Sequence, residues 1–233
     1  MGWRGEGAQH QGARPYQEDS WALRTLADGA LLAVLADGMG GHAGGAVASR
    51  LAVGAFLMAT EGGRNLRESL DAANNAIGQA AARDRALEGM GSTLVAAVVQ
   101  SDEVRWVSVG DSPLYLVAGG SRERLNADHS MVPQIDTLVQ RGILTAEEAA
   151  RHPGRHTLRE AVMGHPLSLV DEGRRALDRG ARLLVCSDGI ETLDAARIVR
   201  QAAAPVQALI DSVLAARAPA QDNVTVIKLE RES

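Results

Sequence analysis

One aspartate stands where a wholly apolar segment meets a glycine-rich loop. Residues 30–36 are all apolar, with no alternation of polar side chains, which predicts a strand buried on both faces. The segment ends at Asp37, and glycines dominate residues 38–45, where they let the backbone approach a small ligand or adopt positive φ. A carboxylate in this position suits a hard cation such as Mg²⁺ or Mn²⁺. Taken alone, an Asp-Gly step also predicts an ordinary turn, as it does at Asp28-Gly29.

The same pattern recurs along the chain. Because the ends of neighbouring strands lie side by side in a sheet, such positions together predict one rim lined with carboxylates. Several carboxylates a few ångströms apart would raise one another's pKa, and oxygen ligands without thiolates favour hard cations over structural zinc. The further acidic positions are Asp111 after residues 106–110, Asp188 after 182–187, Asp222 before 224–227, and Glu18-Asp19 before 20–23.

The carboxylates most closely tied to strand ends are the strongest candidates for metal ligands. They are Asp37, Asp188 and Asp222, and Gly38 could add its backbone carbonyl because it has no Cβ to obstruct the approach. Two cations that share one carboxylate would lower the pKa of a bridging water and orient it for in-line attack.

Two basic side chains could complete such chemistry. Arg14 lies four residues before Glu18, and its guanidinium could bind two oxygens of a phosphoryl group and neutralise charge in the transition state. A solvated surface arginine is the alternative. His42, in the glycine-rich loop, could protonate a leaving alkoxide, or it could only hydrogen-bond a carboxylate.

Other mechanisms find less support. The remaining histidines in or near residues 128–166 lack metal-ligand spacing and are interpreted as surface or structural residues. Ser130 and Ser187 have no evident His–Asp partners, which disfavours a nucleophilic serine. Residues 38–41 lack the Gly-Lys-Ser/Thr ending of a Walker loop and the glycine spacing of a dinucleotide site.

Length, charge and cysteine content exclude several classes of protein. The chain has 233 residues, 45% of them hydrophobic, which is enough for a sizeable core. Its formal net charge of −5 argues against nucleic-acid binding. The sequence contains no apolar run of about 18 residues, so we expect no membrane span, and the N-terminus does not resemble a signal peptide. One cysteine, Cys186, excludes an internal disulfide. We expect a cytoplasmic protein.

The order of predicted elements suits two packed antiparallel sheets with helices outside. No internal linker is evident, so we expect one domain over residues 1–233. Polar residues 128–166 form an insertion, either a mobile flap over the rim or a packed helical connection. The expected strands are 20–26, 30–36, 92–100, 104–110, 113–118, 181–187 and 223–229, and the expected helices are 44–60, 65–88, 132–141, a short one from 145, a turn or two in 157–163, 194–203 and 206–216. No element is expected in residues 1–17.

These motifs together resemble the bacterial metal-dependent serine/threonine phosphatases of the protein phosphatase 2C (PPM) family. Any one motif is weak evidence, but seven in the family's order are highly specific, and they span nearly the whole chain. They are Arg14-Pro15-Tyr16-Gln17-Glu18-Asp19, Asp37-Gly38-Met39-Gly40-Gly41-His42, Gly91-Ser92-Thr93, Val109-Gly110-Asp111-Ser112, Asp128-His129-Ser130, Ser187-Asp188-Gly189 and Asp222-Asn223-Val224-Thr225.

The resemblance implies an α+β fold, a four-layer α-β-β-α sandwich of two antiparallel sheets flanked by helix pairs, with two Mn²⁺ or Mg²⁺ ions at one end. Water would attack phosphorus directly, without a phospho-enzyme. Arg14 would bind the substrate phosphate, and residues 128–166 would be the flap. By this resemblance Asp37 would bridge both ions, Asp188 and Asp222 would bind one of them, and the Gly38 carbonyl would bind the other. Glu18 would bind through a water, with Asp19 and Asn223 in support. Asp111 and Asp188 would hold a weaker third ion.

The implied substrates are phosphoserine and phosphothreonine proteins, dephosphorylated by a monomer that opposes a bacterial Ser/Thr kinase. Two alternatives are a catalytically silent module that binds phosphoproteins and a hydrolase of small phosphoesters. Three positions depart from the family pattern: Gln17 replaces an asparagine, Ala46 a glutamate, and Pro113 the arginine after Gly-Asp-Ser. None of them is a predicted direct ligand.

Overall fold

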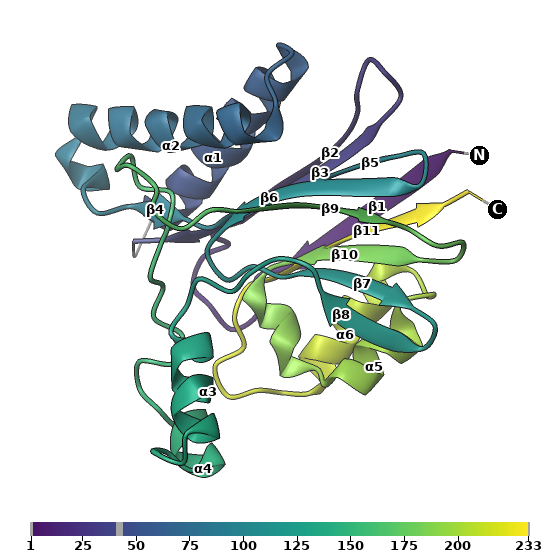
Figure 1. Cartoon of the computed structure of the whole chain (residues 1–233). Coiled ribbons are helices and arrows are strands. Elements are labelled where there is room, and N and C mark those ends of the chain that lie inside the picture. The colour runs from purple at the N-terminus through teal and green to yellow at the C-terminus, as the bar shows by residue number, and fades with distance from the viewer. Residues whose placement is uncertain (1, 41–43, 233) are drawn as a thin grey trace.

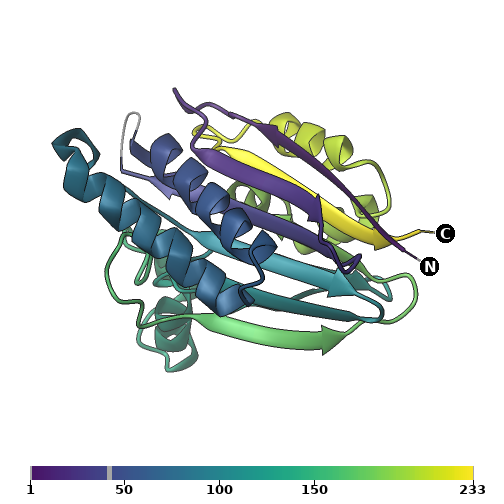
Figure 2. The ribbon, with the colours of Figure 1, turned by 90° about the horizontal axis from the view of Figure 1, so that it is seen from above.

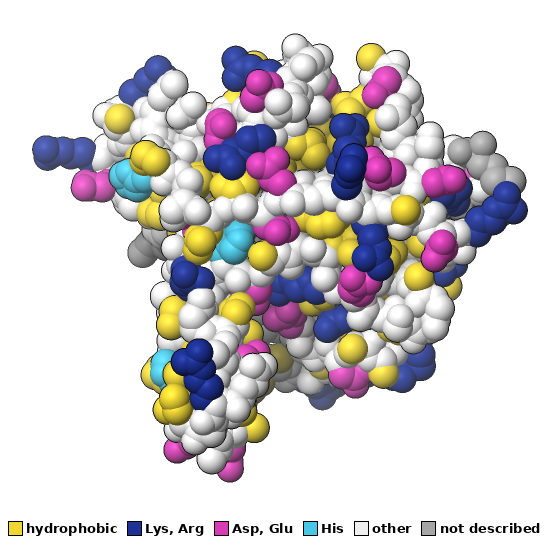
Figure 3. Space-filling model, viewed as in Figure 1, with side chains coloured by type: hydrophobic (Ala, Val, Ile, Leu, Met, Phe, Trp, Pro, Cys, Tyr) yellow, Lys and Arg dark blue, Asp and Glu magenta, His cyan; other side chains and the backbone are white. Residues whose placement is uncertain are grey.

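The computed structural model describes residues 2–40 and 44–232 of the chain. Two antiparallel β-sheets pack face to face, and a pair of helices covers the outer face of each (Figure 1). The predicted four-layer α-β-β-α arrangement is therefore confirmed. None of the helices in the described residues has the length and apolar character needed to cross a membrane. Positive and negative side chains are interspersed on the face shown in Figure 3, so no single sign of charge dominates it.

The first sheet joins both ends of the chain. Its strands are, in spatial order, β1 (Trp3–His10), β11 (Val224–Arg231), β10 (Arg182–Cys186), β7 (Leu114–Ala118) and β8 (Ser121–Arg124). The expectation of no element in residues 1–17 is wrong because β1 is a strand. It is an edge strand rich in glycine, and its glycines are needed because a Cβ at Gly7 would collide with the ring of Trp21 on β2.

The second sheet carries the predicted hairpin and meander. Its spatial order is β2 (Asp19–Thr25), β3 (Leu31–Met39), β5 (Leu94–Gln100), β6 (Glu103–Val109) and β9 (Asp171–Ala176), and β4 (Gly91–Ser92) pairs with the end of β3. Gly29, with φ of +80°, forms the turn between β2 and β3. Strand β9 was not predicted, because this edge strand consists mostly of charged, partly exposed residues and lacks apolar alternation.

Strand β3 shows why residues 30–36 contain no polar side chain. Leu32 and Val34 pack under the helix pair α1 (Gly44–Glu61) and α2 (Leu66–Arg83). Leu31, Ala33 and Leu35 point to the opposite face, into the core between the two sheets. Helices α5 (Ala195–Gln201) and α6 (Val206–Ala215) cover the other sheet in the same way. In Figure 2, α1 and α2 run side by side along the second sheet.

Predicted helix starts agree with the observed caps. Asn65 and Glu68 form a capping box at the start of α2, and Thr145 and Glu148 form another at α4 (Ala146–Ala150). The end of α2 was predicted too late. The helix stops at Arg83 because Asp84 adopts an extended conformation, and a short 3₁₀ helix, η1 (Arg85–Leu87), follows.

The insertion of residues 128–166 projects from one end of the sandwich, with α3 (Val132–Gln140) and α4 at its tip (Figure 1). The helical turns expected in residues 157–163 are absent from the structure. Instead this stretch makes isolated β-bridges, from Leu158 to Ser130 and from Val162 to Ser92. The second bridge ties the insertion to β4, next to the predicted metal loop.

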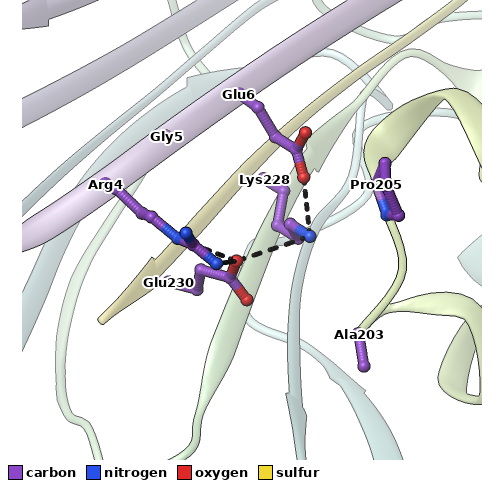
Figure 4. A pocket seen from close by; sticks show the side chains of 7 residues that line it. All are labelled: Arg4, Gly5, Glu6, Ala203, Pro205, Lys228 and Glu230. Carbon is purple, nitrogen blue, oxygen red and sulfur yellow. Dashed lines mark hydrogen bonds and ion pairs between the residues drawn. The ribbon is translucent and has the colours of Figure 1, made fainter. Parts of the chain in front are cut away.

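An ion-pair cluster joins β1 and β11 to the turn between α5 and α6 (Figure 4). Lys228, the chain's sole lysine, is only 2% exposed; it donates to the Ala204 carbonyl at 2.7 Å and lies 2.7 Å from Glu6 Oε1. Arg4 binds Glu230 at 2.7 Å in the same small cavity of about 330 Å³. The cations that line this cavity are thus already paired within the chain.

Replacing Lys228 with methionine should lower the free energy of unfolding by about 1–3 kcal/mol, because the partly buried Ala204 carbonyl loses its donor and the Glu230 carboxylate loses a nearby positive charge. Urea denaturation measures the change. The control Glu6→Gln alters a carboxylate that water reaches and should cost less than about 1 kcal/mol. An equal loss in both variants would contradict a buried role for the lysine.

Candidate active site

A cleft of about 670 Å³ opens where β2, β3, β10 and β11 meet at one end of the sandwich. The predicted site residues come to it from five separate parts of the chain. Asp19 lies buried beneath the cleft, and His42 lies outside the described residues. The other predicted residues line the cleft: Arg14, Glu18, Asp37, Gly38, Asp111, Asp188, Asp222 and Asn223.

On the second sheet, the register of the hairpin places Asp19 opposite Asp37. The loop before β5 holds the end of β3. Thr93 Oγ1 accepts from the Asp37 N–H at 3.0 Å, and Ser92 Oγ donates to the Asp37 carbonyl at 2.9 Å. The motif Gly91-Ser92-Thr93 therefore fixes the backbone from which the Asp37 carboxylate projects.

Close backbone packing explains two glycines next to Asp37. A Cβ at Gly38 would collide with the Gly45 carbonyl oxygen, and a Cβ at Gly45 would collide with the Glu18 carboxylate. The Gly38 N–H also donates to the Glu18 carbonyl at 3.1 Å. Only glycine at both positions lets the end of β3, the start of α1 and Glu18 approach this closely.

On the first sheet, Asn223 holds the N-terminal segment against β11. Its side-chain oxygen accepts from the Glu18 N–H at 2.7 Å, and its amide donates to the carbonyls of Gln11 and Tyr16 at 2.7 and 3.0 Å. The Arg14 guanidinium pairs with Asp222 and remains half exposed at the cleft. Asn223 thereby positions both predicted functional residues of that segment, Arg14 and Glu18.

Asp19 connects the two sheets below the cleft. Its Oδ2 accepts from Ser187 Oγ at 2.8 Å and from Thr225 Oγ1 at 2.6 Å, both on the first sheet's side of the sandwich. Gln17, which departs from the family pattern, accepts from the Asp19 N–H through its side chain at 3.0 Å. This contact gives the glutamine a local role at the start of β2.

The cleft is electrostatically unfavourable without a cation. Burial, followed by repulsion from Asp19, Asp188, Asp111 and Asp222, holds the pKa of Asp37 well above its usual range. Burial and then Asp111 raise the pKa of Asp188 to about 8. Burial is also the main cause that raises the pKa of Asp19 and of Asp111 to about 6 each.

Several carboxylate oxygens in this region are buried but have no hydrogen-bond partner. They are Glu18 Oε1, Asp19 Oδ1 and Asp188 Oδ1. Unpartnered buried oxygens beside mutually repelling carboxylates fit a divalent cation, which would satisfy both. Within residues 2–40 and 44–232, no three Asp, Glu, His or Cys side chains stand close enough to enclose an ion unaided. Mg²⁺ commonly binds through one or two carboxylates and retains waters.

The insertion, predicted either as a flap over the rim or as a packed helical connection, supplies the opposite wall of the cleft, but none of its residues was predicted as a site residue. His156 and His165, interpreted from sequence as surface or structural residues, both lie on this wall. His129 is structural: it is buried, and its Nδ1 accepts from the Gly110 N–H at 3.3 Å. No periodic signal could have revealed the wall, because residues 156–161 form neither helix nor strand.

Residues 5–223 match the family model of protein phosphatase 2C. The chain belongs to this family. Serine/threonine protein phosphatase PstP of Mycobacterium tuberculosis is 39% identical over 211 residues, which cover 85% of this chain and 40% of that protein. Serine/threonine phosphatase stp of Listeria monocytogenes is 31% identical and covers 94% of this chain and 92% of that protein. The chain thus spans less than half the length of the mycobacterial relative.

Solved structures agree with this membership. The crystal structure of M. tuberculosis PstP/Ppp superposes with a TM-score of 0.85 at 32% identity and covers all of both chains. The catalytic domain of PstP in complex with two manganese ions gives a TM-score of 0.80 at 30% identity, covering 98% of this chain and 97% of that one.

Replacing Asp37 with asparagine should stabilise the metal-free protein, because near neutral pH the buried Asp37 carboxyl must either carry a charge that faces other carboxylates or take up a proton on folding. We expect a gain of about 1 kcal/mol, or about 2–4 °C in Tm, measured in chelator near neutral pH. Since the folded-state pKa of Asp37 is raised, ionising it costs stability as pH rises, so the advantage of asparagine should shrink toward about pH 5. With Mn²⁺ added, wild type should gain more stability than the variant; a lower Tm for the variant in chelator would refute this account.

Proposed function

We propose that this chain is a metal-dependent serine/threonine protein phosphatase that hydrolyses phosphoserine and phosphothreonine. The main support is the cleft, where carboxylates from both sheets converge with unpartnered oxygens beside an exposed arginine. Membership in the protein phosphatase 2C family and the names of its relatives point the same way. Nothing favours a catalytically silent module.

The proposed cofactors are two Mn²⁺ or Mg²⁺ ions, with a weaker third. Bound there, such ions supply a water of lowered pKa and stabilise negative charge at phosphorus. The related catalytic domain of PstP, solved in complex with two manganese ions, supports the choice. The residues proposed to hold them are Asp37, the Gly38 carbonyl, Asp188, Asp222, Glu18 and Asp111, with Asp19 and Asn223 in support.

The chain's own residues would bind and orient the substrate. Among the described residues, Arg14 donates only to Asp222, through one guanidinium nitrogen, which leaves its other N–H groups to bind phosphoryl oxygens. Asn223 holds the Arg14–Glu18 segment in place, and Asp19 braces the two sheets beneath it. The role of His42 as an acid or as a hydrogen-bonding group stays a prediction.

The remaining proposals concern the biological setting. We propose one catalytic domain over residues 1–233 with residues 128–166 as its flap, acting as a cytoplasmic monomer. The proposed substrates are bacterial proteins phosphorylated by a cognate serine/threonine kinase. Relatives named serine/threonine phosphatases support the substrate class.

The proposed function requires Mn²⁺-dependent phosphate release from p-nitrophenyl phosphate and from a phosphothreonine peptide. Asp188→Ala should lower kcat/KM by more than about 100-fold, because it removes a proposed ligand. The control Asp211→Ala removes an exposed carboxylate on α6 and should leave activity unchanged. Turnover that a chelator does not affect would refute the proposal, and higher kcat/KM on phosphorylated metabolites than on phosphopeptides would favour a small-molecule hydrolase.

Arg14 gives a separate test of phosphate binding. Arg14→Ala should lower kcat/KM by about 100-fold, because a charge-assisted donor to the phosphoryl group is lost. Arg14→Lys should recover only part of the activity, since an ammonium keeps the charge but not the forked geometry. Arg64→Ala, an exposed arginine away from the cleft, is the matched control. A wild-type kcat/KM in Arg14→Ala would contradict phosphate binding by Arg14 and support the alternative of a solvated surface arginine.

A further inference from the structure

Asp111 differs from the other cleft carboxylates because an arginine holds its backbone. Arg124, the last residue of β8, is largely buried, with 21% of its side chain exposed. Its Nη2 donates to the Asp111 carbonyl at 2.7 Å, and its Nη1 donates to Asp128 Oδ2 at 3.2 Å. One guanidinium thus connects a predicted metal-ligand residue to the base of the insertion.

The same side chain faces a third segment. Its Nη1 lies 3.9 Å from Glu191 Oε1, and Glu191 belongs to the short helix η2 (Asp188–Thr192), which begins at the cleft residue Asp188. The Tyr115 hydroxyl donates to the same Glu191 oxygen at 3.1 Å. Arg124 is therefore surrounded by acceptors from the Asp111 loop, the insertion and η2.

The strand register explains how residue 124 reaches this place. Arg124 pairs with Tyr115 across β7 and β8, so it lies diagonally opposite position 113. Pro113, which stands where the family pattern has an arginine, carries no charge and no backbone N–H. In this chain the positive charge beside Asp111 comes from the neighbouring strand.

We propose that Arg124 is a positioning residue for the metal site, acting through its hydrogen bond to the Asp111 backbone. This inference rests on the proposed function, in which Asp111 binds a metal ion. Two effects of the guanidinium oppose each other: its positive charge repels a nearby cation, whereas its hydrogen bonds hold the Asp111 loop in a binding geometry. Replacing Arg124 therefore separates the two effects: Mn²⁺ affinity should rise if repulsion dominates and fall if positioning of the Asp111 loop dominates.

Calorimetric titration of metal-free protein with Mn²⁺ tests the proposal. Arg124→Gln should weaken binding at the Asp111 site by about 10–100-fold, in the direction of Asp111→Ala, and should raise the Mn²⁺ concentration needed for half-maximal turnover. Arg122→Gln is the matched control. Arg122 lies on the same strand with its guanidinium over the Tyr115 ring, and the variant should bind Mn²⁺ as wild type does.

Binding by Arg124→Gln that equals or exceeds wild type would overturn the inference, because charge alone would then account for the residue. If that variant fails to fold by circular dichroism, Arg124→Lys takes its place. It keeps the charge but cannot bridge both acceptors, so the proposal requires weaker Mn²⁺ binding from it as well. If Asp111→Ala binds Mn²⁺ like wild type, the metal role of Asp111 is wrong and the inference falls with it. If Asp111→Ala weakens Mn²⁺ binding but the Arg124 variants do not, the role of Arg124 is wrong and the metal role of Asp111 stands.

Discussion

Repulsion among buried carboxylates is the constraint on which the rest of this structure depends. Burial raises the pKa of Asp37, Asp111 and Asp188, and neighbouring carboxylates raise each of them further. The sandwich must hold these carboxylates together against their repulsion. A divalent cation would reverse the sign of this interaction, so the arrangement that destabilises the metal-free protein is the one suited to binding metal.

Hydrogen bonds from both sheets oppose this repulsion. Asp19 on β2 accepts from Ser187 and Thr225 on the other side of the sandwich, and Thr93 holds the backbone of Asp37. Asn223 then fastens the segment that carries Arg14. The apolar core between the sheets fixes the separation of the strands, and these polar contacts fix the positions of the strand ends.

Two arginines contact the carboxylate-bearing segments of the site and differ in what they bind. Arg14 is half exposed and pairs with the cleft carboxylate Asp222. Arg124 is mostly buried and donates to the Asp111 carbonyl and to Asp128. The family arginine after Gly-Asp-Ser is absent here, and β8 brings a cation to the same neighbourhood.

Much of the fold was predictable from sequence because its signals are local. The apolar strand ending at Asp37, the Gly29 turn, and the caps at Asn65 and Thr145 all follow from neighbouring residues. Strand β1 and the cleft wall at residues 156–161 were not predictable: the first depends on pairing with β11 at the far end of the chain, and the second has no periodic pattern. Sequence alone determined which residue types could bind metal and phosphate. Only the tertiary structure decided that Arg124 touches Asp111, because strand register and side-chain reach exist only in the folded chain.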